Sequence, residues 1–311
     1  DKPYLLGAVF GEYDQNLVAI ENRLGVYIAA RGNKLQIEGD AESAARARDV
    51  LQGLYNRLAA GQTIDSGAVE AVIAMSAEPT LDGIIRHDVS EPPKVMIRTR
   101  KKTIVPRSAN QGLYMEALAR NELIFALGPA GTGKTYLAVA QAVSQLITGS
   151  VDRLILSRPA VEAGERLGFL PGDMKEKVDP YLRPLYDALY DTLPAEQVER
   201  RIASGEIEIA PLAFMRGRTL ANAFIILDEA QNTTIAQMKM FLTRFGEGSR
   251  MVICGDPKQV DLPQPGASGL ADAVERLEGI EGIAVSRFTT ADVVRHPIVG
   301  RIVAAYEGPN A

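Results

Sequence analysis

A glycine-rich octapeptide lies near the middle of the chain, between an apolar run and a stretch with helical spacing. It reads GPAGTGKT over residues 128–135 and fits the pattern G-x-x-x-x-G-K-[ST]. Residues 122–127 predict a strand and residues 135–147 a helix, which is the strand–loop–helix setting that this pattern requires. Because glycine tolerates positive φ, such a loop turns its backbone N–H groups inward, and the helix N-terminus behind it favours anions. The octapeptide therefore predicts a site for the phosphates of a nucleoside triphosphate.

Every residue of this loop is a candidate ligand of the triphosphate. Lys134 is expected to reach the β- and γ-phosphates, and Thr135 to hold a Mg²⁺ ion through its hydroxyl oxygen. The remaining candidates surround the phosphates with their backbone: Gly128, Pro129, Ala130, Gly131, Thr132 and Gly133.

The composition is that of an ordinary globular protein. Apolar residues make up 46% of the 311 positions and charged residues 23%, which is enough for two domains with cores of their own.

No run approaches the roughly 18 apolar residues of a membrane span, and no secretory signal is recognisable, so we expect a cytoplasmic protein with no membrane partner. The single cysteine, Cys254, lies in an apolar run, where core packing is expected. The formal net charge of −5 argues against wholesale coating of nucleic acid, although local basic surfaces are compatible with it.

Residues 1–76 predict a small α/β domain. The spacing of apolar residues indicates a hairpin, a further strand before it and three helices. In chain order we expect a strand over 4–10, a helix over 16–24, strands over 26–30 and 34–38, and helices over 40–61 and 65–76.

Residues 77–108 predict a linker, because few of their positions have the periodicity of a core-facing element. The segment contains four prolines, Pro79, Pro92, Pro93 and Pro106, and it carries the basic residues Lys94, Arg98, Arg100, Lys101, Lys102 and Arg107. Two interpretations stay open. This basic stripe is either a solvated connector, which is the usual role of such runs, or a guide for a nucleic-acid backbone.

Residues 109–311 predict a larger α/β domain. Six apolar, strand-like runs alternate with helical segments and cover residues 122–127, 152–156, 206–210, 223–227, 250–254 and 283–287. This alternation is typical of a mainly parallel sheet that is covered by helices.

Two of these strands end in polar residues suited to hydrolysis. Asp228 and Glu229 follow the run over 224–227, and ligands of open α/β sheets bind at the carboxyl ends of the strands. We expect Asp228 to hold Mg²⁺, directly or through water, and Glu229 to orient and polarise an attacking water. The run over 250–254 leads into a polar turn, in which Gln259 is expected to contact both the γ-phosphate and that water. The acids therefore extend the expectation from binding to hydrolysis.

The three motifs, in this order and with the sequences DEAQ and GDPKQ, resemble the first RecA-like core of superfamily 1 helicases. The sequence around them is similar to the PhoH family of ATPases over nearly all of residues 100–307. The most specific stretches are SRPAV at 157–161, GERLGFLPG at 164–172, DPYLRP at 179–184 and DVVRHP at 292–297. The resemblance implies a RecA-like P-loop NTPase domain with ATP and Mg²⁺ as its ligands, and it implies that Gln111 reads the adenine base.

Superfamily 1 helicases close the nucleotide site with arginines from a second RecA-like domain, but only about fifty residues follow Gln259 here. An arginine that stabilises the transition state is worth about 10³–10⁵ in rate, so we expect one from elsewhere. Arg287 is the first candidate, supplied by a neighbouring subunit, and Arg295 is the second. Arg158 and Arg218 are candidates within the chain. Head-to-tail contacts that close form rings, and the PhoH resemblance implies a homo-oligomeric ring, with a hexamer expected.

Residues 17–39 resemble the later part of a KH domain, a module that grips single-stranded RNA through a GXXG loop. The corresponding place holds Gly11, Glu12, Tyr13 and Asp14, which lack the second glycine and include two acids. Either this KH-like unit binds RNA through another face, or it serves assembly and partner docking. PhoH-like proteins with such a unit are associated with RNA metabolism and with a bacterial endoribonuclease, so single-stranded RNA and such a nuclease are the expected partners.

Three functions are compatible with these features. The leading one is a Mg²⁺-dependent ATPase that forms a ring and couples hydrolysis to movement or remodelling of RNA. The second is an ATP-gated scaffold that recruits or regulates an endoribonuclease without translocating on RNA. The third is a small-molecule kinase with the same phosphate loop. The first 76 residues show no cluster of acids that would hold catalytic metals, so no nuclease activity of the chain itself is expected.

Overall fold

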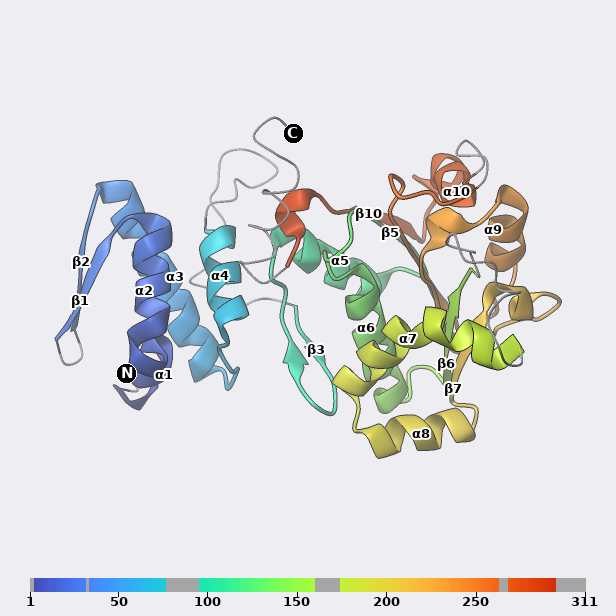
Figure 1. Ribbon diagram of the computed structural model, residues 1–311, viewed down its shortest axis with the longest axis horizontal. Helices are drawn as coiled ribbons and strands as arrows, with labels where there is room; N and C mark the ends of the chain where they lie inside the picture. Colours follow the sequence, from blue (N-terminus) through green and yellow to red (C-terminus); the bar gives the residue numbers. More distant parts are fainter. Residues whose placement is uncertain (1–2, 32–33, 77–94, 160–173, 263–267, 295–311) are drawn as a thin grey trace. The chain divides into compact units, whose positions relative to one another are not determined.

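The computed structural model describes most of the chain, and Figure 1 shows the helices and strands. The described residues are 3–31, 34–76, 95–159, 174–262 and 268–294.

These residues form two compact units. The first contains the described residues up to Val95, together with residues 105–112 and Val294. The second contains residues 96–104 and the described residues from Leu113 to Val293. Since residues 95–112 are divided between the two units, the predicted boundaries at 76 and 108 stay a prediction.

The first unit combines four helices with one hairpin. In chain order they are α1 (Leu6–Phe10), α2 (Gln15–Leu24), β1 (Tyr27–Arg31), β2 (Lys34–Glu38), α3 (Ala41–Ala59) and α4 (Ser66–Met75). The two strands pair antiparallel, with Tyr27 opposite Glu38. Asp40 caps α3 by accepting hydrogen bonds from the backbone N–H groups of Glu42 and Ser43, at 3.1 and 2.9 Å. The predicted hairpin and the three helices over 16–24, 40–61 and 65–76 are therefore confirmed.

The prediction of a strand over residues 4–10 is wrong. This run is helical, with a short 3₁₀ turn at Pro3–Leu5 followed by α1, and Val9 is buried in the core of the unit. A short apolar run has no periodicity that separates a strand from one turn of buried helix. Gly11, with φ of 78°, ends the helix by donating its N–H to the carbonyl of Gly7.

Part of the predicted linker is folded. Two short strands, β3 (Ile97–Arg98) and β4 (Thr103–Ile104), pair antiparallel, and their two isoleucines are buried. Residues 77–94, which include three of the prolines and Lys94, lie outside the described residues.

The second unit is a parallel sheet with helices. Its remaining elements are α5 (Ala109–Arg120, which begins in the first unit), β5 (Leu123–Leu127), α6 (Lys134–Thr148), β6 (Arg153–Arg158), α7 (Met174–Thr192), α8 (Ala195–Ala203), β7 (Ile207–Pro211), β8 (Ala223–Leu227), α9 (Ile235–Leu242), β9 (Arg250–Gly255), α10 (Gly269–Leu277) and β10 (Ile283–Arg287). The strand order is β10-β5-β9-β8-β6-β7, and every pairing is parallel. The six predicted strands and the parallel sheet are confirmed.

Burial explains this strand order. All five residues of β8 are buried, as are five of the six in β9, whereas the residues of β10 at the edge are partly or fully exposed. Continuous apolar runs suit strands that are covered on both faces. Cys254 of β9 lies in this core as expected, and burial raises the pKa of its thiol to about 12.

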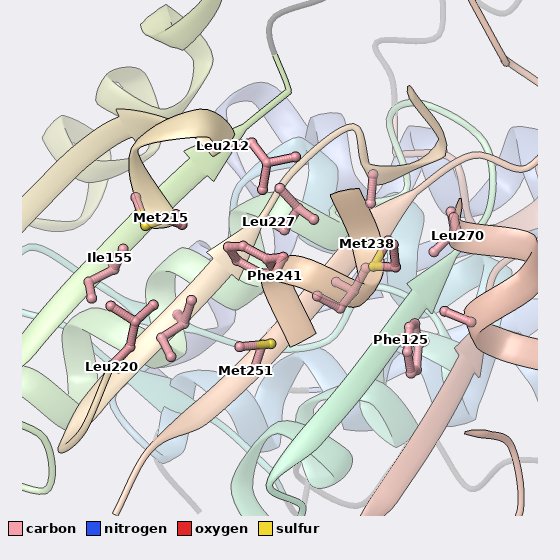
Figure 2. Close-up of a cluster of buried hydrophobic side chains, with 14 of the residues drawn as sticks. Phe125, Ile155, Leu212, Met215, Leu220, Leu227, Met238, Phe241, Met251 and Leu270 are labelled. Carbon is pink, nitrogen blue, oxygen red and sulfur yellow. The ribbon is translucent and has the colours of Figure 1, made fainter. Parts of the chain in front are cut away.

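One face of the sheet packs against α9 and α10. Met238 and Phe241 of α9 join Phe125, Leu227 and Met251 of the strands in a single buried cluster, which Figure 2 shows. The tight packing of this face fixes the sheet whose ends carry the predicted site. Among the described residues, no helix is both long enough and apolar enough to cross a membrane.

Replacement of Phe241 by alanine is expected to destabilise the protein by about 3–5 kcal/mol, because it leaves a cavity in a fully buried cluster. Phe214→Ala makes the same change at a side chain that is 62% exposed and should cost less than about 1 kcal/mol. Urea unfolding followed by circular dichroism measures both values. Equal losses for the two variants would contradict the assignment of Phe241 to the core.

Candidate nucleotide-binding site

The parallel sheet brings the three predicted motifs to one edge. The phosphate loop follows β5, Asp228 follows β8 and Asp256 follows β9, which lies between these two strands. In the hydrogen-bond register Leu127 of β5 is opposite Gly255 of β9. Motifs that are far apart in the sequence are therefore neighbours in space.

A cavity of about 530 Å³ opens at this edge, within the range typical of small-ligand sites. Residues from all three motifs line it, including Lys134, Thr135, Asp228, Glu229, Asp256 and Gln259. Side chains of α7 form part of the wall.

The phosphate loop has the backbone path predicted from its glycines. The φ angle is 145° at Gly128, 84° at Gly131 and 85° at Gly133, values that other residues rarely adopt. A Cβ atom at position 128 would also come within 2.7 Å of the Cβ of Phe288. Gly133 is the N-cap residue of α6, so the loop leads directly into a helix N-terminus that opens on the cavity.

The ammonium group of Lys134 is enclosed by its own loop. It donates hydrogen bonds to the carbonyl oxygens of Gly128 and Pro129, at 2.6 and 2.7 Å, and the residue is only 9% exposed. Burial lowers the pKa of Lys134, and the negative groups around it oppose this shift. A phosphate is a stronger partner for a buried cation than the neutral carbonyls that now hold it.

Thr135 and Asp228 meet across the motifs. The Thr135 hydroxyl donates to Oδ1 of Asp228 at 2.6 Å. Asp228 is 6% exposed, and burial raises the pKa of its carboxyl group. A desolvated carboxylate beside a hydroxyl oxygen fits a hard cation such as Mg²⁺, which takes oxygen ligands.

A metal at this place needs ligands from the nucleotide. Among the residues that the structure describes, no group of three or more His, Cys, Asp or Glu side chains could hold a metal ion. Mg²⁺ is usually bound through one or two protein oxygens together with substrate phosphates and water, so Thr135 and Asp228 suit it without an all-protein cage.

Glu229 stands at the carboxyl end of β8 in a strained conformation. Its φ of 52° lies in the left-handed region, which is uncommon for a residue with a side chain. Oε1 lies 3.2 Å from Nη2 of Arg158, and Oε2 accepts a 2.5 Å hydrogen bond from the side chain of Gln231. Such strain is typical of functional positions, because surrounding contacts must hold it in place.

Gln231 links two of the motifs, a role that the sequence did not reveal. Besides Glu229, its buried side chain contacts the backbone N–H of Asp256, which donates to Oε1 of Gln231 at 3.1 Å. The DEAQ sequence contained the signal, but only the tertiary structure supplies the partner. Gln259 lines the cavity and is exposed, so a side chain that can reach a ligand is available there.

A second set of contacts that sequence reasoning missed joins the cavity to the β3–β4 hairpin. Tyr136, which directly follows Thr135, donates its hydroxyl hydrogen to Oδ2 of Asp191 at 2.7 Å. The same carboxylate pairs with Lys102 of the hairpin at 2.6 Å. Although partial burial opposes it, the hydrogen bond from Lys102 contributes to holding the pKa of Asp191 below its ordinary value.

The arginines named from the sequence lie in different places. Arg158 lines the cavity. Arg287 ends β10 and forms two hydrogen bonds with Glu278, at 2.6 and 2.8 Å, and Arg218 is held in the same way by Glu208 at 2.6 and 2.7 Å. Neither is among the residues that line the cavity.

Several predicted residues are not placed at the cavity. Gln111 belongs to the first unit, where its side-chain oxygen accepts from the backbone N–H of Arg107 at 2.8 Å, and its adenine contact stays a prediction. Arg295 and residues 164–172 lie outside the described residues.

Comparison with known proteins agrees with the geometry of the site. Residues 103–307 match the PhoH family, described as PhoH-like protein. A PhoH-like protein of Mycobacterium tuberculosis is 50% identical over 305 residues, covering 98% of this chain and 85% of the relative. A PhoH-like protein of Bacillus subtilis is 50% identical over 303 residues, covering 97% and 94%. Protein PhoH of Escherichia coli is 49% identical over 205 residues, covering 65% and 58%. The chain therefore belongs to the PhoH family, and its second unit is an α/β P-loop domain of the ATPase type.

Proposed function

We propose that this chain hydrolyses ATP with Mg²⁺ in the cavity at the sheet edge and couples hydrolysis to the binding and remodelling of RNA. One observation carries the proposal for hydrolysis. The 2.6 Å hydrogen bond from Thr135 to Asp228 joins the phosphate loop to the acidic strand end, where Glu229 borders the same cavity. A loop that only bound phosphate would not need a second acid at this position.

The chemistry divides among these residues. Lys134 exchanges its loop carbonyls for phosphate oxygens, and the N–H groups of the loop and of the α6 N-terminus hold the remaining charge. Glu229 accepts a proton from a water molecule that attacks the γ-phosphorus, and the bond to the leaving ADP oxygen breaks. Thr135 and Asp228 would hold Mg²⁺, whose positive charge would neutralise the phosphate oxygens.

Exposed basic residues support a role with RNA. Arg98, Arg100 and Lys101 are exposed on or between β3 and β4, and cationic side chains of this kind bind phosphate backbones. The neighbouring Lys102 reaches Asp191, which in turn contacts Tyr136 beside the phosphate loop. A phosphate backbone that competes with Asp191 for Lys102 would thus change the contacts of Asp191, which binds Tyr136 beside the phosphate loop.

The ring is supported by the position of Arg287. Its side chain is 54% exposed at the carboxyl end of β10 and does not line the cavity of its own chain. We therefore propose that Arg287 acts on the cavity of a neighbouring subunit. The subunits would form a head-to-tail ring, as a hexamer.

A second candidate function is an ATP-gated scaffold for an endoribonuclease. The turn at Gly11 carries Glu12 and Asp14, and the side chain of Tyr13 is fully exposed with φ of 52°. Acids at this turn repel phosphates, whereas an exposed aromatic side chain suits a protein partner. This observation favours docking over RNA binding for the first unit.

Glu229→Gln is expected to retain ATP binding and to reduce phosphate release by about 10²–10⁴-fold, because the amide cannot accept the proton of water. Lys134→Ala, which removes a cation of the site, should instead weaken ATP binding. Calorimetric titration measures affinity, and phosphate release without an added acceptor measures turnover and excludes a kinase as the main activity. Wild-type turnover in Glu229→Gln would remove Glu229 from its role.

Single-stranded RNA is expected to raise the rate of ATP hydrolysis several-fold, with the protein assembled as a ring in mass measurements of the same sample. Triple replacement of Arg98, Arg100 and Lys101 by alanine should abolish the stimulation and leave the basal rate unchanged. A rate of ATP hydrolysis that is unchanged by RNA but changes with a nuclease partner would favour the scaffold. A purely monomeric, fully active enzyme would contradict the ring.

A further inference from the structure

Arg158 is placed where it can act on both the nucleotide and the residue that activates water. It ends β6, one strand beyond β8 in the sheet, and its side chain lines the cavity with 22% exposure. Lys134 and Arg158 are the two cationic side chains among the described residues that line this cavity. Lys134 belongs to the phosphate loop, so Arg158 is the cation that lines the cavity from outside that loop.

In this structure, Arg158 pairs with Glu229, the residue proposed to activate water. Its Nη2 lies 3.2 Å from Oε1 of Glu229, while Gln231 binds Oε2 at 2.5 Å. Both oxygens of the carboxylate therefore have donors. A carboxylate has about four lone-pair sites, so these two donors occupy part of them, and the departure of Arg158 would leave Oε1 open to an attacking water.

The contact is one that a phosphate can displace. Glu229 has a side-chain exposure of 38%, and ion pairs that are partly open to solvent contribute little. The contact is also longer than the 2.6 Å approaches by which Arg218 and Arg287 hold their glutamates. Guanidinium groups bind phosphate oxygens strongly, because their planar N–H groups match the geometry of the phosphate.

We propose that Arg158 exchanges Glu229 for the terminal phosphate when ATP binds. The exchange, which rests on the proposed ATPase function, has two effects at once. It frees an oxygen of Glu229 to accept from water, and it places a positive charge on the phosphoryl group that is transferred. ADP lacks the terminal phosphate and leaves Arg158 on Glu229, so the residue distinguishes the triphosphate from the diphosphate.

This exchange would also make Arg158, one of the two candidates within the chain, the arginine that is expected at the site from the sequence. An arginine that stabilises the transition state is worth about 10³–10⁵ in rate, whether it comes from the same chain or from a partner. Arg158 reaches the cavity from its own chain, so its contribution does not require a neighbouring subunit.

The test uses the Glu229→Gln background, in which ATP is expected to bind with strongly reduced turnover and position 229 has no charge. Any loss of ATP affinity on removing Arg158 then comes from its contact with phosphate and not from an exposed Glu229. Calorimetry with Mg²⁺ compares ATP and ADP on Glu229→Gln, on Glu229→Gln with Arg158→Ala, and on Glu229→Gln with Arg158→Lys. The matched control is Arg276→Ala, an exposed arginine on α10 that pairs with Asp272.

Arg158→Ala should weaken ATP binding about tenfold in this background and leave ADP binding unchanged, since a hydrogen bond to a charged group is lost. Arg158→Lys should retain part of the preference for ATP. In the chain with Glu229 intact, Arg158→Ala should lower kcat by about 10³. Arg276→Ala should change none of these values.

Equal losses for ATP and ADP, or no loss for either, would overturn the exchange. An unchanged or increased kcat in Arg158→Ala would also overturn it. That result is expected if Arg158 only restrains Glu229, because removal of an inhibitory contact does not slow turnover. These outcomes are distinct from a failure of the proposed function. In that case the wild-type chain would release no phosphate from ATP.

Discussion

All strands in the six-stranded sheet of the second unit run in the same direction, and the rest of the site depends on this. Parallel strands place their carboxyl ends at one edge, where the connecting loops can form a common cavity. Because β9 lies between β5 and β8, the turn at Asp256 stands between the phosphate loop and the acids. Gln231 can therefore bridge Glu229 and Asp256 within one layer of hydrogen bonds.

The site keeps charges where burial opposes them. Burial raises the pKa of Asp228 and lowers the pKa of Lys134, and each shift favours the neutral form. Since the folded-state pKa of Asp228 is above its unfolded value, its effect on stability is most favourable at low pH and is lost as the pH rises through the folded pKa. The ionised form of this buried carboxyl group destabilises the fold relative to the protonated form, and a bound cation would offset that penalty. The buried charges of Asp228 and Lys134 therefore lower the stability of the ligand-free protein, and a bound metal and triphosphate would compensate for them.

The sequence predicted what depends on local chemistry. Glycine spacing fixed the path of the phosphate loop, and six apolar runs became the six strands, since buried parallel strands need continuous apolar sequence. The run over 4–10 was misassigned because one turn of buried helix and a short strand look alike. The folding of Ile97 and Ile104 into a hairpin was missed, because two-residue strands have no measurable period.

Contacts between distant elements were beyond prediction. Arg158 was one of four candidate arginines, and only the strand order shows that it reaches Glu229. Arg287 was chosen because it ends a strand, yet its pairing depends on Glu278 beyond α10. The link from Tyr136 through Asp191 to Lys102 joins three segments that no motif connects. A sequence shows which groups can do chemistry, whereas the fold decides which of them meet.

The most direct measurement is the rate of phosphate release from ATP as a function of free Mg²⁺, compared between the wild-type chain and Asp228→Asn. Asp272→Asn, on α10 and outside the residues that line the cavity, serves as the matched control. The predicted result is no release in excess chelator, saturation with Mg²⁺ in the wild type and the control, and a much higher Mg²⁺ requirement or no activity in Asp228→Asn. Release that persists in chelator, or an Asp228→Asn curve that superimposes on the wild type, would contradict the account.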